Sequence, residues 1–425
     1  MTNFGKNLID FMNYSKTAYH AVSKIALKLE REGFTRLYES ESWELKRGGK
    51  YYVVRAGSSI IAFVNNGGGF MIGAAHSDSP SFRVKEDSLL GAYVKLDTER
   101  YGGMINYTWL DRPLTVAGRV TVRCDGGVES RLADIGGRIV VIPSLAIHMN
   151  RGVNESLKLN PAKELLPLAS LSGEKGGILE YAAKSAGVRV EDVVSHELYL
   201  VSAEKPTVFG LEDEMLLSPR LDDLSSVSSM LEGFVESADK ASATPVFAVF
   251  DNEEVGSATR QGAASTFLFD TLGRIAKDEN DYLTRIASSF MVSADNAHAL
   301  HPNYPEMSDK ANAPILGGGV AIKYNANKKY ATDSVSDAVF REICRIGGVK
   351  VQSYFNRADL PGGSTLGSIA DTNVSVPTVD IGIPQLAMHS ANECIALSDA
   401  NEMKKVFSVY FARVLEVKGE KTVIR

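Results

Sequence analysis

The adjacent acids Glu253 and Glu254 stand shortly after an apolar run at residues 245–250. The run is rich in β-branched and aromatic residues and therefore predicts a strand that is buried on both faces. Successive side chains of an extended backbone point to opposite sides, so one acid could hold a cation while the other transfers protons. Taken alone, such a pair is more often a solvated acidic turn, so its interpretation depends on the rest of the chain.

Four apolar runs of the chain end within a few residues of side chains that can bind metals. These side chains are His76, the pair Glu253 and Glu254, Asp295, and His389. Because sites in open α/β sheets lie outside the carboxyl ends of the strands, we expect the four groups to converge. Asp222 precedes a helical stretch and could join them, although helix capping is the simpler explanation for that position.

Two histidines and several carboxylates suit a pair of divalent ions. Each ion would take one histidine and one carboxylate, and a third carboxylate would bridge them. The set contains no cysteine, which argues against a purely structural zinc site. Two ions about 3.5–4 Å apart can hold and acidify a water molecule, and a spare glutamate would act as the general base. Asp78 lies two residues after His76 and could orient that imidazole.

The composition is that of an ordinary globular protein. The 425 residues are 44% hydrophobic and 23% charged, with a formal net charge of −6. This mild acidity gives no electrostatic reason to expect binding to nucleic acid or to an anionic membrane. Three widely separated cysteines form no disulfide framework, which favours a reducing, cytoplasmic location. No apolar run approaches the roughly 18–20 residues needed to cross a bilayer, and the start of the chain lacks the apolar core of a signal peptide.

The N-terminal part of the chain predicts one helix followed by strands. Apolar residues recur at helical spacing from about residue 7 to Gly33, where the glycine should end the helix. Strand-like runs follow at residues 51–55, 60–64 and 70–75. We therefore expect an α/β domain that begins here and resumes near residue 215.

Between about residues 85 and 212 the pattern changes to short alternating strands. Strands are expected at 91–96, 114–122, 138–141 and 194–201, and a polar, loop-like segment at 150–175. The stretch predicts a mostly β insertion with its own small core. The corresponding division is a discontinuous domain of residues 1–85 and 213–425, interrupted by residues 86–212.

The motifs that carry the chemistry resemble those of the aspartyl aminopeptidase family of co-catalytic zinc metallopeptidases. The matching stretches are residues 75–80, 218–223, 251–257, 293–299, 323–332 and 388–390. They span nearly the whole chain in the family's order. The resemblance implies a mixed-sheet catalytic domain with helices on both faces and a β-rich insertion that forms dimers.

The resemblance also implies a ligand set for two zinc ions per subunit. His76 and Asp295 would bind one ion, Glu254 and His389 the other, and Asp222 would bridge both. Histidine and carboxylate ligands do not select strictly among metals, so cobalt or manganese would also fit.

The same resemblance implies roles for further residues. Glu253 would be the general base, and Asp78 would orient His76. The substrate pocket would be lined by His148, His298, Lys323 and Tyr330. Asp223 departs from the family, in which asparagine is more usual at that position. This departure concerns the residues that support the ligands and not the ligand set itself.

The expected reaction is removal of one N-terminal residue from a peptide with a free N-terminus. Lys323 offers a cation for an acidic side chain, which favours Asp or Glu at the first position. An aminopeptidase of neutral or broad specificity is the nearest alternative, and a non-catalytic oligomeric binding protein is a more distant one. The net acidity and the lack of a phosphate-binding glycine loop disfavour a phosphatase or nuclease.

The resemblance implies a homo-oligomer, a tetrahedral dodecamer built from dimers. In such an assembly His148 would reach into the active site of a neighbouring subunit.

Overall fold

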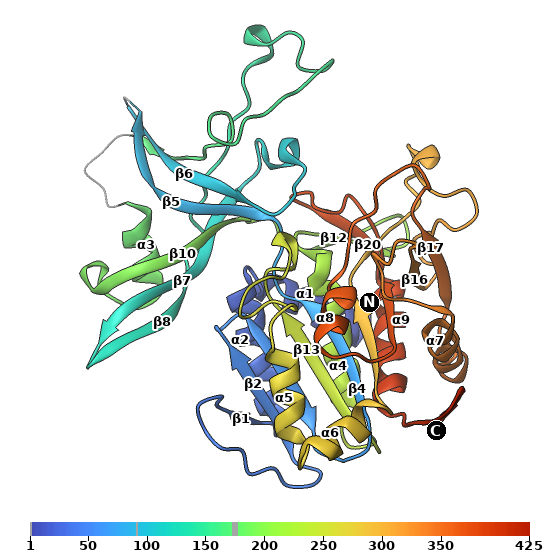
Figure 1. Cartoon of the computed structure of the whole chain (residues 1–425). Helices are drawn as coiled ribbons and strands as arrows, with labels where there is room; N and C mark the ends of the chain where they lie inside the picture. The colour runs from blue at the N-terminus through green and yellow to red at the C-terminus, as the bar shows by residue number, and fades with distance from the viewer. Residues whose placement is uncertain (1, 91, 172–176) are drawn as a thin grey trace.

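The computed structural model describes residues 2–90, 92–171 and 177–425. Its largest element is a nine-stranded sheet with the order β1-β2-β3-β13-β4-β14-β18-β16-β17 (Figure 1). Its strands are β1 (Thr35–Leu37), β2 (Lys50–Arg55), β3 (Ser59–Val64), β4 (Phe70–His76), β13 (Thr244–Phe250), β14 (Phe290–Ala294), β16 (Val320–Tyr324), β17 (Val351–Phe355) and β18 (Thr378–Gly382). The central strands β13, β4, β14 and β18 run parallel, whereas β3 and β16 join them antiparallel. The predicted mixed sheet is confirmed.

Helices cover both faces of this sheet. One face carries α1 (Asn3–Tyr14), α2 (Ala18–Arg31), α4 (Leu221–Ser237), α7 (Ser334–Gly347) and α9 (Leu397–Phe411). The other carries α5 (Phe267–Ile275), α6 (Glu279–Ile286) and α8 (Leu366–Asn373). The two layers build two separate hydrophobic clusters, one on each side of the sheet.

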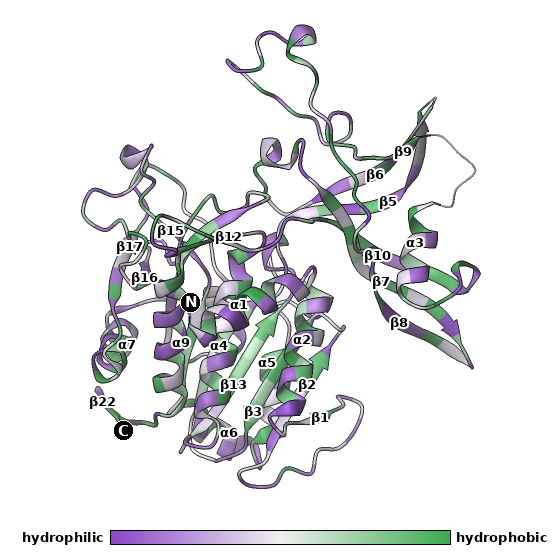
Figure 2. Ribbon diagram, turned by 180° about the vertical axis from the view of Figure 1, so that it is seen from behind, coloured by the Kyte–Doolittle hydropathy of each residue, from purple (hydrophilic) through white to green (hydrophobic). Residues whose placement is uncertain are grey.

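Strand β13 is buried on both faces because its side chains alternate between the two helix layers. Phe247 and Val249 pack on the side of α4 and α9, whereas Val246 and Phe250 pack on the side of α5 and α8. Figure 2 shows mostly hydrophobic residues along this strand. The prediction of a doubly buried strand before the two acids is confirmed.

The prediction of one N-terminal helix is wrong, because the chain forms α1 and α2 with a break between them. Ser15 leaves helical geometry after α1, and Thr17 is extended before α2. The Thr17 hydroxyl lies 2.9 Å from His20 Nδ1, at the start of α2. The predicted end is confirmed, since α2 stops at Arg31 and Gly33 adopts a φ of +83°.

The second sheet forms a lobe of its own beside the first (Figure 1). Its six antiparallel strands follow the order β8-β7-β10-β5-β6-β9. They are β5 (Ser81–Leu90), β6 (Tyr93–Tyr101), β7 (Leu114–Cys124), β8 (Gly127–Asp134), β9 (Leu168–Leu171) and β10 (Val193–Ser202). Helix α3 (Ile178–Ser185) packs on this sheet and joins its hydrophobic cluster.

The strands expected at 114–122 and 194–201 are confirmed, and the one at 91–96 corresponds to β6. The strand expected at 138–141 is wrong, because these residues make only isolated bridges. Helix α3 was not expected. Residue 91 of the expected strand and residues 172–175 of the expected loop lie outside the described residues.

A small third sheet lies near the carboxyl ends of the central strands. Its order is β11-β12-β20-β19-β15. The strands are β11 (Thr207–Phe209), β12 (Met215–Ser218), β15 (Ala297–His298), β19 (Pro384–Leu386) and β20 (Glu393–Ala396), and a C-terminal hairpin follows, β21 (Leu415–Lys418) and β22 (Lys421–Ile424). Within the described part of the chain, no helix is both long and apolar enough to cross a membrane.

Candidate metal centre

The metal-binding side chains predicted from separate apolar runs meet at one edge of the large sheet. Strand β4 ends in His76, β14 is followed directly by Asp295, and β13 leads into the turn that carries Glu253 and Glu254. Strand β4 pairs in parallel with both β13 and β14, so the three carboxyl ends are neighbours. The predicted convergence of these groups is confirmed.

Asp222 lies between the two imidazoles. Its Oδ1 is 3.4 Å from His76 Nε2, and its Oδ2 is 3.1 Å from His389 Nε2. Asp222 and Asp223 have non-helical backbone angles at the start of α4, and Asp222 is 3% exposed. One carboxylate therefore faces two histidines through its two different oxygens, which is the arrangement that a bridging ligand requires.

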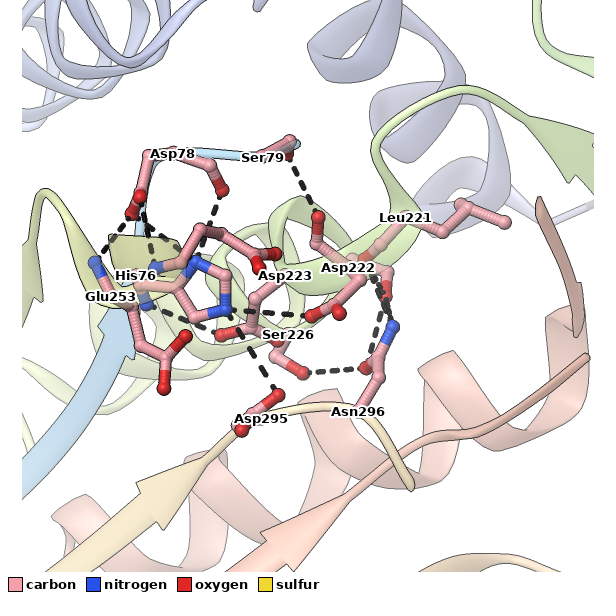
Figure 3. Close-up of polar contacts among 12 residues, drawn as sticks. His76, Asp78, Ser79, Leu221, Asp222, Asp223, Ser226, Glu253, Asp295 and Asn296 are labelled. Atoms are coloured by element: carbon pink, nitrogen blue, oxygen red, sulfur yellow. Dashed lines mark hydrogen bonds and ion pairs between the residues drawn. The ribbon is translucent and has the colours of Figure 1, made fainter. Parts of the chain in front are cut away.

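Two further carboxylates complete two overlapping groups. Asp295 Oδ1 is 4.0 Å from His76 Nε2, and Glu254 Oε1 is 3.3 Å from His389 Nε2. Ligand atoms lie within 4.8 Å of one another in His76–Asp222–Asp295 and in Asp222–Glu254–His389. Figure 3 shows the imidazole of His76 directed toward Asp222 and Asp295.

The charges and hydrogen bonds of this cluster fit divalent cations. Asp222 Oδ1 and Glu254 Oε1 are buried but accept no hydrogen bond from the described residues. Burial raises the pKa of Glu254 to about 7, against the opposing attraction of the His389 imidazole, whose Nε2 lies 3.3 Å from Oε1. Burying carboxylates without hydrogen-bond donors is costly unless a cation compensates them. The donor set consists only of imidazoles and carboxylates, which are common ligands of catalytic zinc sites.

Glu253 leaves the strand in a way that the sequence did not predict. The backbone is not extended here, because Asn252 has a φ of 64° and residues Glu253–Val255 form a 3-10 turn. Glu253 is half-buried, and burial is the main cause that raises its pKa to about 8. Glu253 also lies near His76 and Glu254 in a third group that could hold a metal. Its position is therefore compatible with proton transfer or with ligation.

Asp78 supports both glutamates as well as His76. Its Oδ1 accepts a hydrogen bond from the Glu253 backbone N–H at 3.1 Å, and its Oδ2 accepts one from Glu254 N–H at 3.2 Å. His76 Nδ1 is 3.0 Å from the Asp78 backbone oxygen and 3.5 Å from Oδ1 (Figure 3). The carboxylate thus contacts His76 less closely than it contacts the turn that follows β13.

The second sheet contributes a residue that the sequence did not indicate. Tyr101, at the end of β6, donates its hydroxyl to Asp78 Oδ2 at 2.6 Å and accepts a hydrogen bond from Asn252 at 2.9 Å. No local pattern around Tyr101 signals this contact, because Asp78 lies 23 residues away on another strand connection.

Replacing Tyr101 by phenylalanine should lower kcat/KM by about 10-fold, the equivalent of one hydrogen bond to a charged group. The loss leaves Asp78 with fewer donors and loosens the turn that holds Glu253. Steady-state kinetics would measure the fall in kcat/KM. Tyr199→Phe is the control, because it removes the hydroxyl of a neighbouring tyrosine whose ring packs edge-on against Tyr101 at 5.7 Å. Unchanged kinetics of Tyr101→Phe would contradict this support role.

A cavity opens beside the proposed ligands, several of which line it. Its lining residues outside the metal-binding set include Asn296, His298, Lys323, Tyr330, Tyr354, Ser364, Thr365 and Met388. Lys323 is 3% exposed, and its Nζ lies 3.4 Å from Asp295 Oδ2 and 5.4 Å from the centre of the Tyr330 ring. His298 is exposed, with its ring 6.2 Å from that of Tyr354. The structure therefore brings three of the four predicted substrate residues to one cavity.

The fourth, His148, lies elsewhere in the described chain. It belongs to a short 3-10 helix, Ile147–Met149, in the long loop of the second lobe, and it is exposed. His148 is absent from the described residues that line the cavity. Its expected place in a neighbouring subunit's site stays a prediction.

Residues 11–411 match the family model described as Aminopeptidase I zinc metalloprotease (M18). A protein of Clostridium novyi (strain NT), named "Probable M18 family aminopeptidase 2", is 42% identical over 426 residues, which covers 96% of this chain and 98% of that protein. A protein of the same name from Ectopseudomonas mendocina (strain ymp) is 39% identical over 421 residues, covering 96% and 97% of the two chains.

Solved structures are similar over the same extent. "Cryo-EM structure of the Ape4 and Nbr1 complex" superposes with a TM-score of 0.92 at 35% identity, covering 96% of this chain and 85% of that one. "Structure of S. cerevesiae mApe1 dodecamer" superposes with a TM-score of 0.84 at 27% identity, covering 96% of each chain. Together with the convergent histidines and carboxylates, these matches show that the chain belongs to the M18 family of zinc metallo-aminopeptidases, which includes the aspartyl aminopeptidases.

Proposed function

We propose that this aminopeptidase uses two zinc ions per chain and prefers peptides that begin with Asp or Glu. The observation that carries the two-ion part is the carboxylate of Asp222, whose two oxygens face His76 and His389 separately. The proposed ligands are His76 and Asp295 for one ion, Glu254 and His389 for the other, and Asp222 for both. Cobalt or manganese would also suit this donor set.

Ions bound there would supply Lewis-acid chemistry, acidifying a water molecule and polarising the scissile carbonyl. Glu253 would take a proton from the attacking water at its carboxylate and deliver it to the departing amine. Asp78 holds the turn of Glu253 through the backbone N–H and so fixes the direction of that carboxylate. His298, exposed in the cavity, is placed to donate a hydrogen bond to the developing oxyanion.

The acidic preference rests on Lys323. It is a buried ammonium group that lines the cavity, and a substrate carboxylate could accept a hydrogen bond from it. One observation favours neutral or broad specificity instead, because Lys323 already pairs with Asp295 at 3.4 Å. The two specificities predict opposite rankings of Asp and Leu substrates.

The test is hydrolysis of Asp-, Glu- and Leu-anilides by the zinc-loaded protein, before and after chelation. We expect the acidic substrates to be cleaved faster, and chelation to stop cleavage until zinc or cobalt is restored. We expect Lys323→Met to lower kcat/KM for Asp and Glu by about 10²-fold, since truncating one partner of a buried charge pair costs about 2–5 kcal/mol. The Leu substrate should change much less.

Lys329→Met is the matched control, because Lys329 is exposed six residues further along and does not line the described cavity. Zinc content is measured in each variant, since Lys323 also contacts Asp295. Faster cleavage of Leu than of Asp and Glu by the wild type would support neutral specificity and reject the role of Lys323.

We also propose that residues 86–212 form a dimerisation domain inserted between residues 1–85 and 213–425, and that the chain forms a homo-oligomer. A solved relative at 27% identity is described as a dodecamer. The loop that carries His148 exposes the apolar side chains of Leu145, Ile147 and Met149 at 57%, 46% and 74%. Exposed apolar groups gathered in this way are typical of interfaces. Native mass spectrometry would measure the assembly, and a monomer would contradict the proposal.

A reducing, cytoplasmic location is part of this proposal. Cys124, Cys344 and Cys394 are all free thiols. Proteins of oxidising compartments more commonly pair their cysteines.

A further inference from the structure

Glu393 occupies a position between two of the proposed ligands without being one of them. It is the first residue of β20, it is 2% exposed, and it pairs with Ser218 of β12 in the small third sheet. Its Oε2 accepts a hydrogen bond from the backbone N–H of Asp222 at 3.0 Å, and its Oε1 accepts one from the backbone N–H of His389 at 2.7 Å. A single carboxylate thus binds the main chains of two residues that are 167 positions apart.

The backbone of His389 has a geometry that needs support, and the backbone of Asp222 is extended where a helix begins. His389 has a φ of 65°, which is uncommon for a residue with a side chain. Asp222 has a ψ of 110° just before α4 becomes helical. Each oxygen of Glu393 accepts a main-chain hydrogen bond from one of these segments, so one side chain ties the two together.

We infer that Glu393 is a positioning residue for the metal centre, which holds the main chains of Asp222 and His389 at the spacing their side chains need. The inference rests on the proposed ligand set. The inference predicts that loss of Glu393 affects the two zinc ions unequally. The ion bound by Asp222, Glu254 and His389 has two ligands whose main chains are held by Glu393. The position of His76 and Asp295 shares only Asp222 with it. Loss of Glu393 should therefore weaken one ion more than the other.

Asp399 provides a matched control for a merely structural role. It is fully buried, and its carboxylate also accepts two backbone hydrogen bonds, from Gly317 N–H at 2.7 Å and from Gly319 N–H at 2.8 Å. Neither glycine is a proposed ligand. Glu393→Gln and Asp399→Asn each replace one acceptor oxygen by an amide group that faces an N–H. Both variants should therefore lower the free energy of unfolding for the same reason. Only Glu393→Gln should also change zinc binding.

The experiment titrates zinc into the metal-free full chain against a chromophoric chelator, and counts zinc by mass spectrometry. Wild type should bind two zinc ions. Glu393→Gln should bind one of them about 10–100-fold more weakly, the usual effect of losing a group that orients a ligand. Asp399→Asn should bind both as wild type does, even if its Tm falls. Glu393→Asp gives a second variant that keeps the carboxyl group but is one methylene shorter, and it should show the same selective loss.

Wild-type zinc affinities in both folded Glu393 variants would overturn the inference. Fewer than two zinc ions on the wild type would instead overturn the proposed ligand set, and this inference with it. The two failures are therefore distinguished by the wild-type titration alone.

Discussion

Glu253→Gln should lower kcat/KM by about 10²–10⁴-fold, the range expected for loss of a general base. Glutamine has nearly the same shape but cannot accept a proton at the working pH. Because Glu253 is outside both groups that contain Asp222, the variant should keep both zinc ions and its assembly. Anilide hydrolysis measures the first effect, and zinc analysis with native mass spectrometry measures the second.

The zinc count decides between two roles for this residue. Glu253 also lies with His76 and Glu254 in a group that could hold a metal. Loss of one zinc ion from Glu253→Gln would make it a ligand and contradict the general-base assignment. A wild type that binds two zinc ions and assembles, yet cleaves no substrate, would favour the non-catalytic binding protein.

Asp222→Ala should remove both zinc ions and bring hydrolysis below detection. The reason is geometric, since Asp222 Oδ1 faces His76 at 3.4 Å and Oδ2 faces His389 at 3.1 Å, so each ion loses a ligand. The remaining groups would be one histidine and one carboxylate per ion, too few for a four-coordinate zinc site. Zinc analysis after gel filtration measures the loss.

Two variants sharpen this prediction. Asp295→Ala should lose only the ion that it shares with His76. Asp223→Asn should retain both ions, because the amide oxygen can still accept the 3.2 Å hydrogen bond from the His76 backbone N–H. Retention of one zinc ion by Asp222→Ala would show that Asp222 serves a single ion and would contradict the bridging role.

Part of this site could be predicted from local patterns alone. The apolar runs before His76, Glu253 and Asp295 are long enough to be buried on both faces, and doubly buried strands of an α/β protein are mostly parallel. Parallel strands end at the same edge, so ligand types at their ends meet. The observed pairing of β4 with β13 and β14 agrees with that reasoning.

Other features depended on contacts that no local pattern records. The break at residues 15–17 interrupts an apolar stripe that continues at helical spacing on both sides. The 3-10 turn at Glu253 depends on Asp78, which accepts the N–H groups of both glutamates. Hydrophobic periodicity carries no information about such polar contacts.

By itself, then, the sequence determined the α/β class, the doubly buried strands and the residue types at their carboxyl ends, because hydrophobic burial and backbone alternation act over a few neighbouring residues. Only the tertiary structure decided that Asp222 faces both histidines, that Tyr101 of the second lobe contacts Asp78, and that Glu393 binds two ligand segments. Such contacts join residues up to 171 positions apart, and their geometry is set by how sheets and connections pack, not by any spacing along the chain.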